Sequence, residues 1–298
     1  MKYAKPALTI EQQVLQLLKR GMSGDEVLMR ERLASVSYYR LSGYWFPFRQ
    51  PDDTFRSGTT FEAVWERYVF DRTLRLIVMD AVERIEIAVR AKLSYHHAHA
   101  FGPFGYAQDP AALPKLNAAE RGGFVDRIRD EVARCKKEQF VKHFATKYGD
   151  SHQDLPIWMA TEVMSFGTVL SLYRASSRQI KGDVAAVFQV PDLVLDSWLL
   201  TLNTIRNVCA HHSRLWNREI GVVPKLPRAP QYADWHVPVS VAGSRVFTVL
   251  TICRHALRQI APQSAWASRL SALLTQHPTI PAASMGFPDA WRECPIWK

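Results

Sequence analysis

Residues Thr204–Arg214 bring together side-chain types that suit cleavage of a phosphodiester bond. Within this stretch Arg206 and Asn207 are followed by His211. A histidine transfers protons near neutral pH, and an arginine stabilises the negative charge that builds up on phosphate oxygens. In RNA the neighbouring 2′-hydroxyl can be the nucleophile, so this chemistry needs no metal ion. We therefore expect no cofactor.

The same residues fall on one face of a predicted helix that runs from about Pro191 to Leu215. At about 100° per residue, an apolar stripe is expected from Trp198, Leu202, Ile205 and Cys209. The opposite face collects, within about 80°, Asn203, Asn207, His211, Arg214 and Arg218. Arg206 lies on the flank between the two faces. Asn207 and His211 are four residues apart, so we expect the amide to reach the imidazole and orient it.

Arg206, Asn207 and His211 are the predicted catalytic residues, and a structural polar cluster is the alternative. His212 is expected to be an exposed neighbour rather than a catalyst. An Arg and a His separated by four to six residues are by themselves a weak signal. A chain with 26 Arg and 10 His holds about two or three pairs at this spacing by chance. The extended string Arg-Asn-x-x-Ala-His is the stronger one.

Other catalytic and metal-binding patterns are absent from the sequence. It holds no GxGxxG, Walker A, GxSxG or HExxH motif, so nucleotide cofactors and the common hydrolases lose support. His96, His97 and His99 cluster without a nearby carboxylate, which favours surface or hydrogen-bonded histidines over a metal site. The four cysteines stand far apart, so neither a zinc site nor a disulfide framework is expected.

The chain is basic, and its positive charge is concentrated in the last third. It carries 38 Lys and Arg against 28 Asp and Glu, a net charge of +10. Residues 201–298 hold 11 basic and 4 acidic residues, so +7 of the +10 lies there. Arginine makes up 26 of the 38 basic residues and is suited to bidentate phosphate contacts. Charge alone leaves polyanion binding and solubility equally open.

Length and composition indicate a folded protein of one or two domains. The chain has 298 residues, of which 47% are hydrophobic, with 14 Gly and 17 Pro, which excludes disordered, collagen-like and disulfide-scaffold classes. Its first residues form no apolar signal segment, and no apolar stretch approaches the roughly 20 residues of a membrane span. We expect a cytoplasmic protein that does not bind membranes.

Helical periodicity dominates the sequence and predicts an all-α fold. Helices are expected at residues 10–19, 25–38, from 61 for at least eight turns until Gly102, and at 119–148, 156–175, 178–188, 191–215, 240–260 and 264–276. Thr59 and Glu62 have capping-box spacing before the long helix. Prolines between 224 and 238 predict an extended loop with room for a short hairpin. Residues 1–58 are expected to form an N-terminal helical cap. Residues 59–298 are expected to form a helical domain. This domain is either separate from the cap or forms one compact unit with it.

Several residues outside the string are candidate RNA contacts. The aromatic segment Tyr38–Phe48 is expected to pack rather than to stack on bases, but Arg40 within it is a candidate. Arg90 and His96 are separated by five residues and form a second Arg-x5-His element. For Arg90 a structural or RNA-groove role is favoured over a second catalytic motif. Arg214 and Arg218 complete the set of predicted RNA-binding residues.

The string Arg206–His211 resembles the signature of HEPN ribonucleases, an Arg followed by a polar residue and, after four to six positions, a His. Three further stretches resemble the bacterial abortive-infection (Abi-like, AbiD/AbiF-type) family. They are Tyr38–Trp45, Phe70–Arg75 running into Glu83–Arg90, and Leu155–Trp158 through Glu162 to Phe166–Gly167. Together with the Arg206–His211 string, these blocks span about residues 30–220, most of the chain, and four ordered blocks are far more specific than any single one.

The resemblance implies an all-α, HEPN-like helical bundle with an N-terminal extension and C-terminal helices. It also implies phage defence by a toxin-like, metal-independent endoribonuclease that builds one site from the two motifs of a homodimer. Some relatives act with a structured small RNA, so RNA is the expected partner. In this hypothesis His211 transfers the proton, Arg206 stabilises the phosphate, and the products carry a 2′,3′-cyclic phosphate or a 3′-phosphate. The alternatives are a non-catalytic protein that holds a small structured RNA or a partner protein, and an interaction scaffold without RNA.

Overall fold

The fold is all-α, as the sequence predicts. A computed structural model describes residues 2, 6–241 and 243–298. In this part of the chain there are thirteen α-helices, several short 3-10 turns and no β-strand. The helices are α1 (Ile10–Lys19), α2 (Glu26–Val36), α3 (Tyr38–Trp45), α4 (Phe61–Phe101), α5 (Gly105–Gln108), α6 (Ala118–Arg134), α7 (Gln139–Tyr148), α8 (Ile157–Val163), α9 (Phe166–Ala175), α10 (Arg178–Val187), α11 (Asp192–Ala210), α12 (Val246–Ile260) and α13 (Trp266–Gln276).

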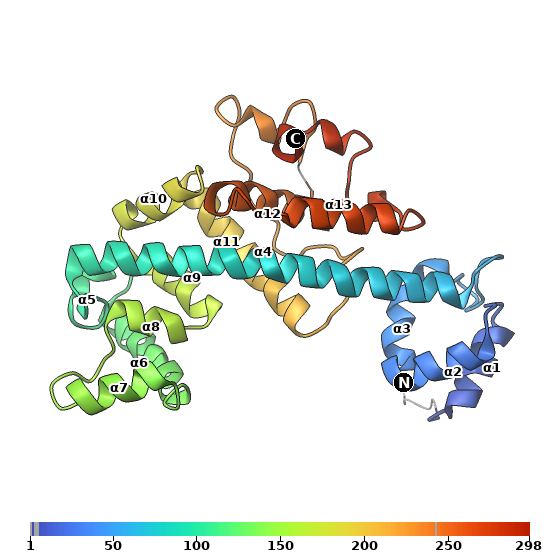
Figure 1. Cartoon of the computed structure of the whole chain (residues 1–298), viewed down its shortest axis with the longest axis horizontal. Helices are drawn as coiled ribbons and strands as arrows, with labels where there is room; N and C mark the ends of the chain where they lie inside the picture. The colour runs from blue at the N-terminus through green and yellow to red at the C-terminus, as the bar shows by residue number, and fades with distance from the viewer. Residues whose placement is uncertain (1, 3–5, 242) are drawn as a thin grey trace.

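Helix α4 is the axis of the molecule. It runs through the middle of the fold, with α1–α3 gathered at one end, α5–α8 at the other, and α12 and α13 along one side (Figure 1). Helices α3, α8, α9, α10, α11, α12 and α13 all contact it. Neighbours on several sides explain why α4 buries apolar residues around much of its circumference instead of along one narrow stripe.

The ends of α4 are set by local capping groups. The Thr60 side chain accepts a hydrogen bond from the Ala63 N–H at 3.1 Å, so the cap lies one residue after the predicted Thr59. The Thr59 hydroxyl instead donates to the Arg56 carbonyl. At the other end Gly102 has φ +72°, a conformation that glycine adopts without steric cost, and the helix stops there as predicted.

Two long predicted helices are each divided in two. The predicted helix 119–148 is α6 and α7, and the predicted helix 156–175 is α8 and α9. The second break is stabilised by Glu131 of α6, whose carboxylate accepts the Ser165 N–H at 3.0 Å and the Thr168 hydroxyl at 2.9 Å. Ser165 also caps α9 through the Thr168 N–H. A tertiary contact therefore favours the break over a continuous helix.

Two other segments differ from their predictions. Tyr38–Trp45, which carries no helix prediction of its own, forms α3. Its Ser37 cap accepts from the Arg40 N–H. The proline-rich loop contains the single 3-10 turn Ala233–Trp235, and its described residues form no hairpin.

One continuous apolar core joins the elements. Side chains of the N-terminal cap such as Val14, Leu33 and Trp45 belong to the same core as residues of α4, α11 and the C-terminal Ile296. The separation of a cap at residue 58 from a domain at residue 59 stays a prediction. Of the described helices, none is by itself long and apolar enough to cross a membrane. Only α10 and α11 taken together, although bent by 72°, reach that length and composition.

The histidine cluster at the end of α4 splits by environment. His97 is buried and its Nε2 lies 2.8 Å from the Ser176 hydroxyl. His96 Nδ1 lies 3.8 Å from Asp183, and His99 is exposed against the Tyr95 ring. Within the described residues no three His, Cys, Asp or Glu side chains converge as metal ligands would.

We predict that His97 makes the fold sensitive to acid. Burial lowers the pKa of His97 from its ordinary 6.5 to about 4, so between these values the unfolded chain binds a proton that the folded chain does not. Stability is then lost as the pH falls through this window, by about 3 kcal/mol at pH 4 relative to pH 7.5. Urea unfolding of wild type and His97→Gln at both pH values should show this component in the wild type only. An equal pH dependence in the two proteins contradicts the assignment.

Candidate active site at the end of helix α11

Helix α11 ends immediately before the candidate histidine. Ala210 is its last residue, His211 caps it, and His212 has φ +56° in the left-handed region. The Ser213 N–H donates to the Val208 carbonyl at 2.9 Å and the His212 N–H to the Cys209 carbonyl at 3.0 Å. These two bonds define a Schellman turn, which most often carries glycine where this chain has His212.

The predicted continuation of the helix to Leu215 is therefore wrong. The apolar stripe is confirmed, because Trp198, Leu202, Ile205 and Cys209 are all buried. Arg214 and Arg218, however, leave the helix face that the projection shared with Asn207 and His211. The chain turns at His212 because the backbone N–H groups of Leu215 and Trp216 are hydrogen-bonded to a side chain of another helix.

The side chain that accepts these hydrogen bonds is Asp71, a fully buried carboxylate on α4. It accepts the Trp216 N–H at 2.7 Å, the Leu215 N–H at 3.0 Å and the Tyr44 hydroxyl at 2.7 Å. Arg75, one turn along α4, pairs with the same carboxylate. Asp71 thus links α3, α4 and the segment after α11, and a buried charge is stable only with such partners.

Burial also fixes the protonation of the groups beside Asp71. It raises the pKa of the Asp71 carboxyl, while Arg75, Tyr44 and the two backbone N–H groups act in the opposite direction. Burial and the neighbouring Asp71 raise the pKa of Tyr44, which stays a neutral donor. Burial raises the pKa of Cys209 to about 12, so this residue of the motif is a buried thiol and not a nucleophile.

Two arginines link α3 to the turn after α11 through hydrogen bonds. Arg40 donates from Nη1 to the His212 carbonyl at 2.6 Å, and Arg214 donates to the Gly43 carbonyl. Between α3 and the turn lies a cavity of about 440 Å³. Its lining has no carboxylate and comprises Ser37, Tyr39, Arg40, Ser42, Gly43, Tyr44, His211, His212, Ser213 and Arg214. A guanidinium has five N–H donors, so both arginines keep donors for an anionic ligand.

Of the three predicted catalytic residues, His211 lines this cavity, whereas Arg206 and Asn207 lie about one turn earlier on α11 and are not part of its lining. His211 and Asn207 are exposed, and Arg206 is half-buried. Arg206 Nη1 lies 3.4 Å from the Asn207 side-chain oxygen, and Arg206 Nε is buried with no hydrogen-bond partner among the described residues. The backbone N–H of His211 donates to the Asn207 carbonyl, but within the described structure no hydrogen bond joins the amide to the imidazole. The side chain of Asn207 therefore bonds to the Arg206 guanidinium and not to the His211 imidazole.

Of the predicted RNA contacts, Arg40 and Arg214 reach this site and the others do not. Arg218 is exposed and donates to the Arg214 carbonyl at 3.3 Å. Arg90 pairs with Glu86 and donates to the Thr161 carbonyl, which ties α4 to α8. Arg90 lies fifteen residues beyond Arg75, about 22 Å along the same helix. His96 lies further still, so these two residues are not brought to His211.

Sequence reasoning missed the groups that support the site. Asp71 and Arg75 carry one signal, a carboxylate and an arginine four residues apart within an apolar helical stretch. Tyr39 was noted only as part of an aromatic segment. Its ring is 89% exposed at the cavity, whereas its neighbours Tyr44 and Trp45 are buried as packing predicts.

A family match covers the part of the chain that forms this site. Residues 31–217, more than half of the chain, match a family described as Abi-like protein. The chain belongs to the Abi-like family. The matched region contains α3, Asp71, Arg75 and the whole of α11 with its turn, and it ends before α12 and α13. No curated protein and no solved structure shows significant similarity to this chain.

We predict that Asp71→Asn is strongly destabilising. The substitution leaves Arg75 buried without its counter-ion, which costs about 3–5 kcal/mol. Asp80→Asn is the matched control, because Asp80 on the same helix pairs with Arg84 and Arg269 near the surface, where such pairs contribute about 1 kcal/mol or less. Both are measured by urea unfolding.

If Asp71→Asn does not fold, Tyr44→Phe removes a single donor from the same carboxylate and should cost about 1–3 kcal/mol. Equal losses for Asp71→Asn and Asp80→Asn, or no loss for Tyr44→Phe, would contradict a central role for Asp71.

Proposed function

We propose that this Abi-like protein is a metal-independent endoribonuclease of abortive infection, of the HEPN and AbiD/AbiF type. The observation that carries the proposal is that His211 lines a cavity together with Arg40 and Arg214, while the paired side chains of Arg206 and Asn207 lie on the preceding turn of the same helix. Membership of the family supports the defence role. The absence of any carboxylate from the cavity lining favours an anionic substrate.

The chemistry follows from the residue types at this site. His211 removes the proton of an RNA 2′-hydroxyl, whose oxygen attacks the adjacent phosphorus. The bond from phosphorus to the 5′-oxygen breaks, and a protonated histidine returns a proton to that oxygen. Arg206 stabilises the charge on the non-bridging oxygens, and Asn207 orients Arg206 through their contact. The products are a 2′,3′-cyclic phosphate, which hydrolyses to a 3′-phosphate, and a 5′-hydroxyl.

A homodimer provides the second histidine that this scheme needs. Asn207, Ala210, His211 and His212 are exposed in one copy, so the motif lies on the surface instead of within a closed active site. A second copy placed against this surface supplies its own His211 as the acid while the first acts as the base. It also excludes water from the phosphate, which strengthens the contact with Arg206.

We predict that Arg206→Ala and His211→Ala each lower the rate of RNA cleavage by about 10²- to 10³-fold. Cleavage of a labelled RNA by purified protein, with and without EDTA, measures the effect. EDTA should leave the wild-type rate unchanged. A requirement for Mg²⁺, or undiminished cleavage by both variants, contradicts the mechanism.

His212→Gly is the matched control for His211→Ala. Glycine adopts the left-handed conformation of residue 212 without strain, so the variant should fold at least as stably as wild type and keep its cleavage rate. Gel-shift titrations of the alanine variants at several salt concentrations separate binding from catalysis. Salt-dependent RNA binding with no cleavage by wild type favours the non-catalytic RNA-binding alternative. No RNA affinity at all favours an interaction scaffold.

A composite site further predicts that activity depends on association of the chain. Cleavage per chain should fall when the protein is diluted below its dimer dissociation constant, because each half-site then lacks its second histidine. Sedimentation velocity over the same concentrations measures the dimer fraction. Constant activity per chain in a protein that sediments as a monomer contradicts a two-chain site.

A further inference from the structure

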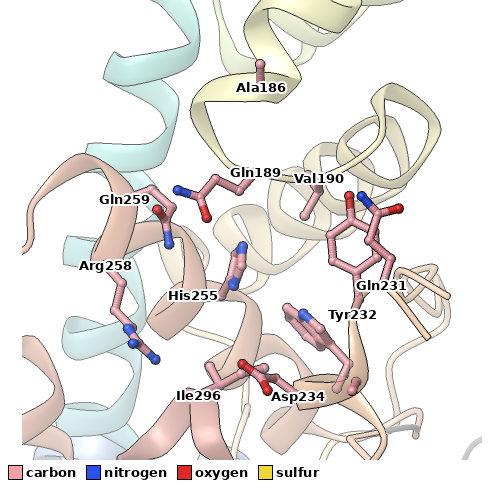
Figure 2. Close-up of a pocket in the computed structure, with 12 residues that line it drawn as sticks. Ala186, Gln189, Val190, Gln231, Tyr232, Asp234, His255, Arg258, Gln259 and Ile296 are labelled. Atoms are coloured by element: carbon pink, nitrogen blue, oxygen red, sulfur yellow. The ribbon is translucent and has the colours of Figure 1, made fainter. Parts of the chain in front are cut away.

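A second cavity lies at the opposite end of α11, away from the Arg206 motif. Its volume is about 650 Å³, within the range of small-molecule sites. Ala186 of α10 and Gln189 and Val190 of the turn between α10 and α11 form part of the lining, while the rest comes from residues 231–296 (Figure 2). Most of the lining therefore lies outside the region that matches the Abi-like family.

Buried aromatic and apolar side chains lie beneath this cavity, whose accessible lining is mostly polar. Trp235 is buried, with its ring 5.2 Å from Trp198 and 5.3 Å from His255 between centroids. Val190 and Ile296 are also buried. The half-buried ring of Tyr232 forms part of the wall (Figure 2). A flat, weakly polar ring fits such surroundings.

His255 presents a fixed hydrogen-bond acceptor to the cavity. Its Nε2 lies 2.8 Å from the Phe188 carbonyl, which can only accept, so Nε2 carries the proton. Burial lowers the pKa of His255, which favours the neutral ring. Nδ1 is then an acceptor, and Figure 2 places the His255 ring below the side chains of Gln189 and Gln259.

Three primary amides line the cavity. Gln189 and Gln259 lie on one side of the cavity, and Gln231 lies on the other beside Tyr232 (Figure 2). Within the described residues, their side-chain amides make no hydrogen bonds, so each offers a free donor and a free acceptor. A primary amide offers both a donor and an acceptor, which is the chemistry that recognises the hydrogen-bonding edge of a nucleobase, as glutamine does with adenine.

Opposite charges complete the lining. Arg258 donates from Nη1 to the Pro295 carbonyl at 3.2 Å and keeps further N–H groups for a phosphate. Asp234 is exposed at the same cavity and can accept from the hydroxyls of a ribose. A base edge, a sugar diol and a phosphate thus each have a complementary group.

We propose that this cavity binds a nucleoside monophosphate unit, either as a free nucleotide or as an unpaired nucleotide of an RNA. The base packs against the half-buried ring of Tyr232 and bonds to the glutamines and His255, and the phosphate pairs with Arg258. This site is separate from the proposed active site, because the nineteen residues of α11 place about 28 Å between them.

Calorimetric titration of the full-length protein with AMP, GMP, CMP and UMP tests the proposal. At least one nucleotide should bind saturably. Gln259→Leu and Arg258→Ala should each raise its Kd by about tenfold or more. The matched controls are Gln276→Leu and Arg292→Ala, which change the same residue types away from the cavity and should leave the Kd unchanged.

The two sources of the nucleotide are distinguished with single-stranded RNA. If the cavity holds a nucleotide of an RNA, the free nucleotide competes with RNA binding and Gln259→Leu weakens both. If it holds a free nucleotide, RNA affinity is unchanged by Gln259→Leu. Absence of binding by all four nucleotides, or a Kd unaffected by both cavity substitutions, overturns the proposal. His211→Ala should bind the nucleotide as wild type does, so failure of the proposed cleavage mechanism is seen separately.

Discussion

The buried carboxylate of Asp71 joins the three parts of the molecule on which the candidate active site depends. It accepts hydrogen bonds from Tyr44 of α3 and from the backbone of Leu215 and Trp216, and it pairs with Arg75 of its own helix. These bonds require the chain to leave α11 at His211 and turn sharply. They thereby position His211 at the end of a rigid helix, with α3 and its Arg40 beside it. The site is a consequence of this one buried charge and its donors.

Much of the fold follows from local sequence, because the period of apolar residues and the capping side chains predict α1, α4, α10 and α13 closely. The helix predictions fail where a side chain distant in sequence determines where a helix ends. The break before α9 depends on Glu131, and the end of α11 depends on Asp71. Residues 211–220 contain no glycine or proline, so the sequence carries no local stop signal there, and His212 takes the left-handed position instead. For the candidate site, the sequence predicted Arg206, Asn207, His211, Arg40 and Arg214, of which Arg40, His211 and Arg214 line one cavity, whereas the contacts of Asp71 are visible only in three dimensions.

Helix α11 connects two regions of different composition. Its C-terminal end lies in the family-matched region and carries the arginine and histidine motif, while its N-terminal end borders a cavity built mostly from the C-terminal third of the chain. That third also carries +7 of the net charge of +10. Trp198 of α11 packs directly against His255 and Trp235 in the second cavity. Trp235, which lines that cavity, thus packs against the same helix that ends at His211.

The chemistry of the cut ends tests the central claim most directly. Mass spectrometry of RNA fragments produced by the purified wild-type protein in EDTA reads both termini of each fragment. Attack by the 2′-hydroxyl with His211 and Arg206 predicts 5′-hydroxyl ends and 2′,3′-cyclic phosphate or 3′-phosphate ends. Fragments with 3′-hydroxyl and 5′-phosphate ends would show that water, and not the 2′-hydroxyl, is the nucleophile, and would contradict the account.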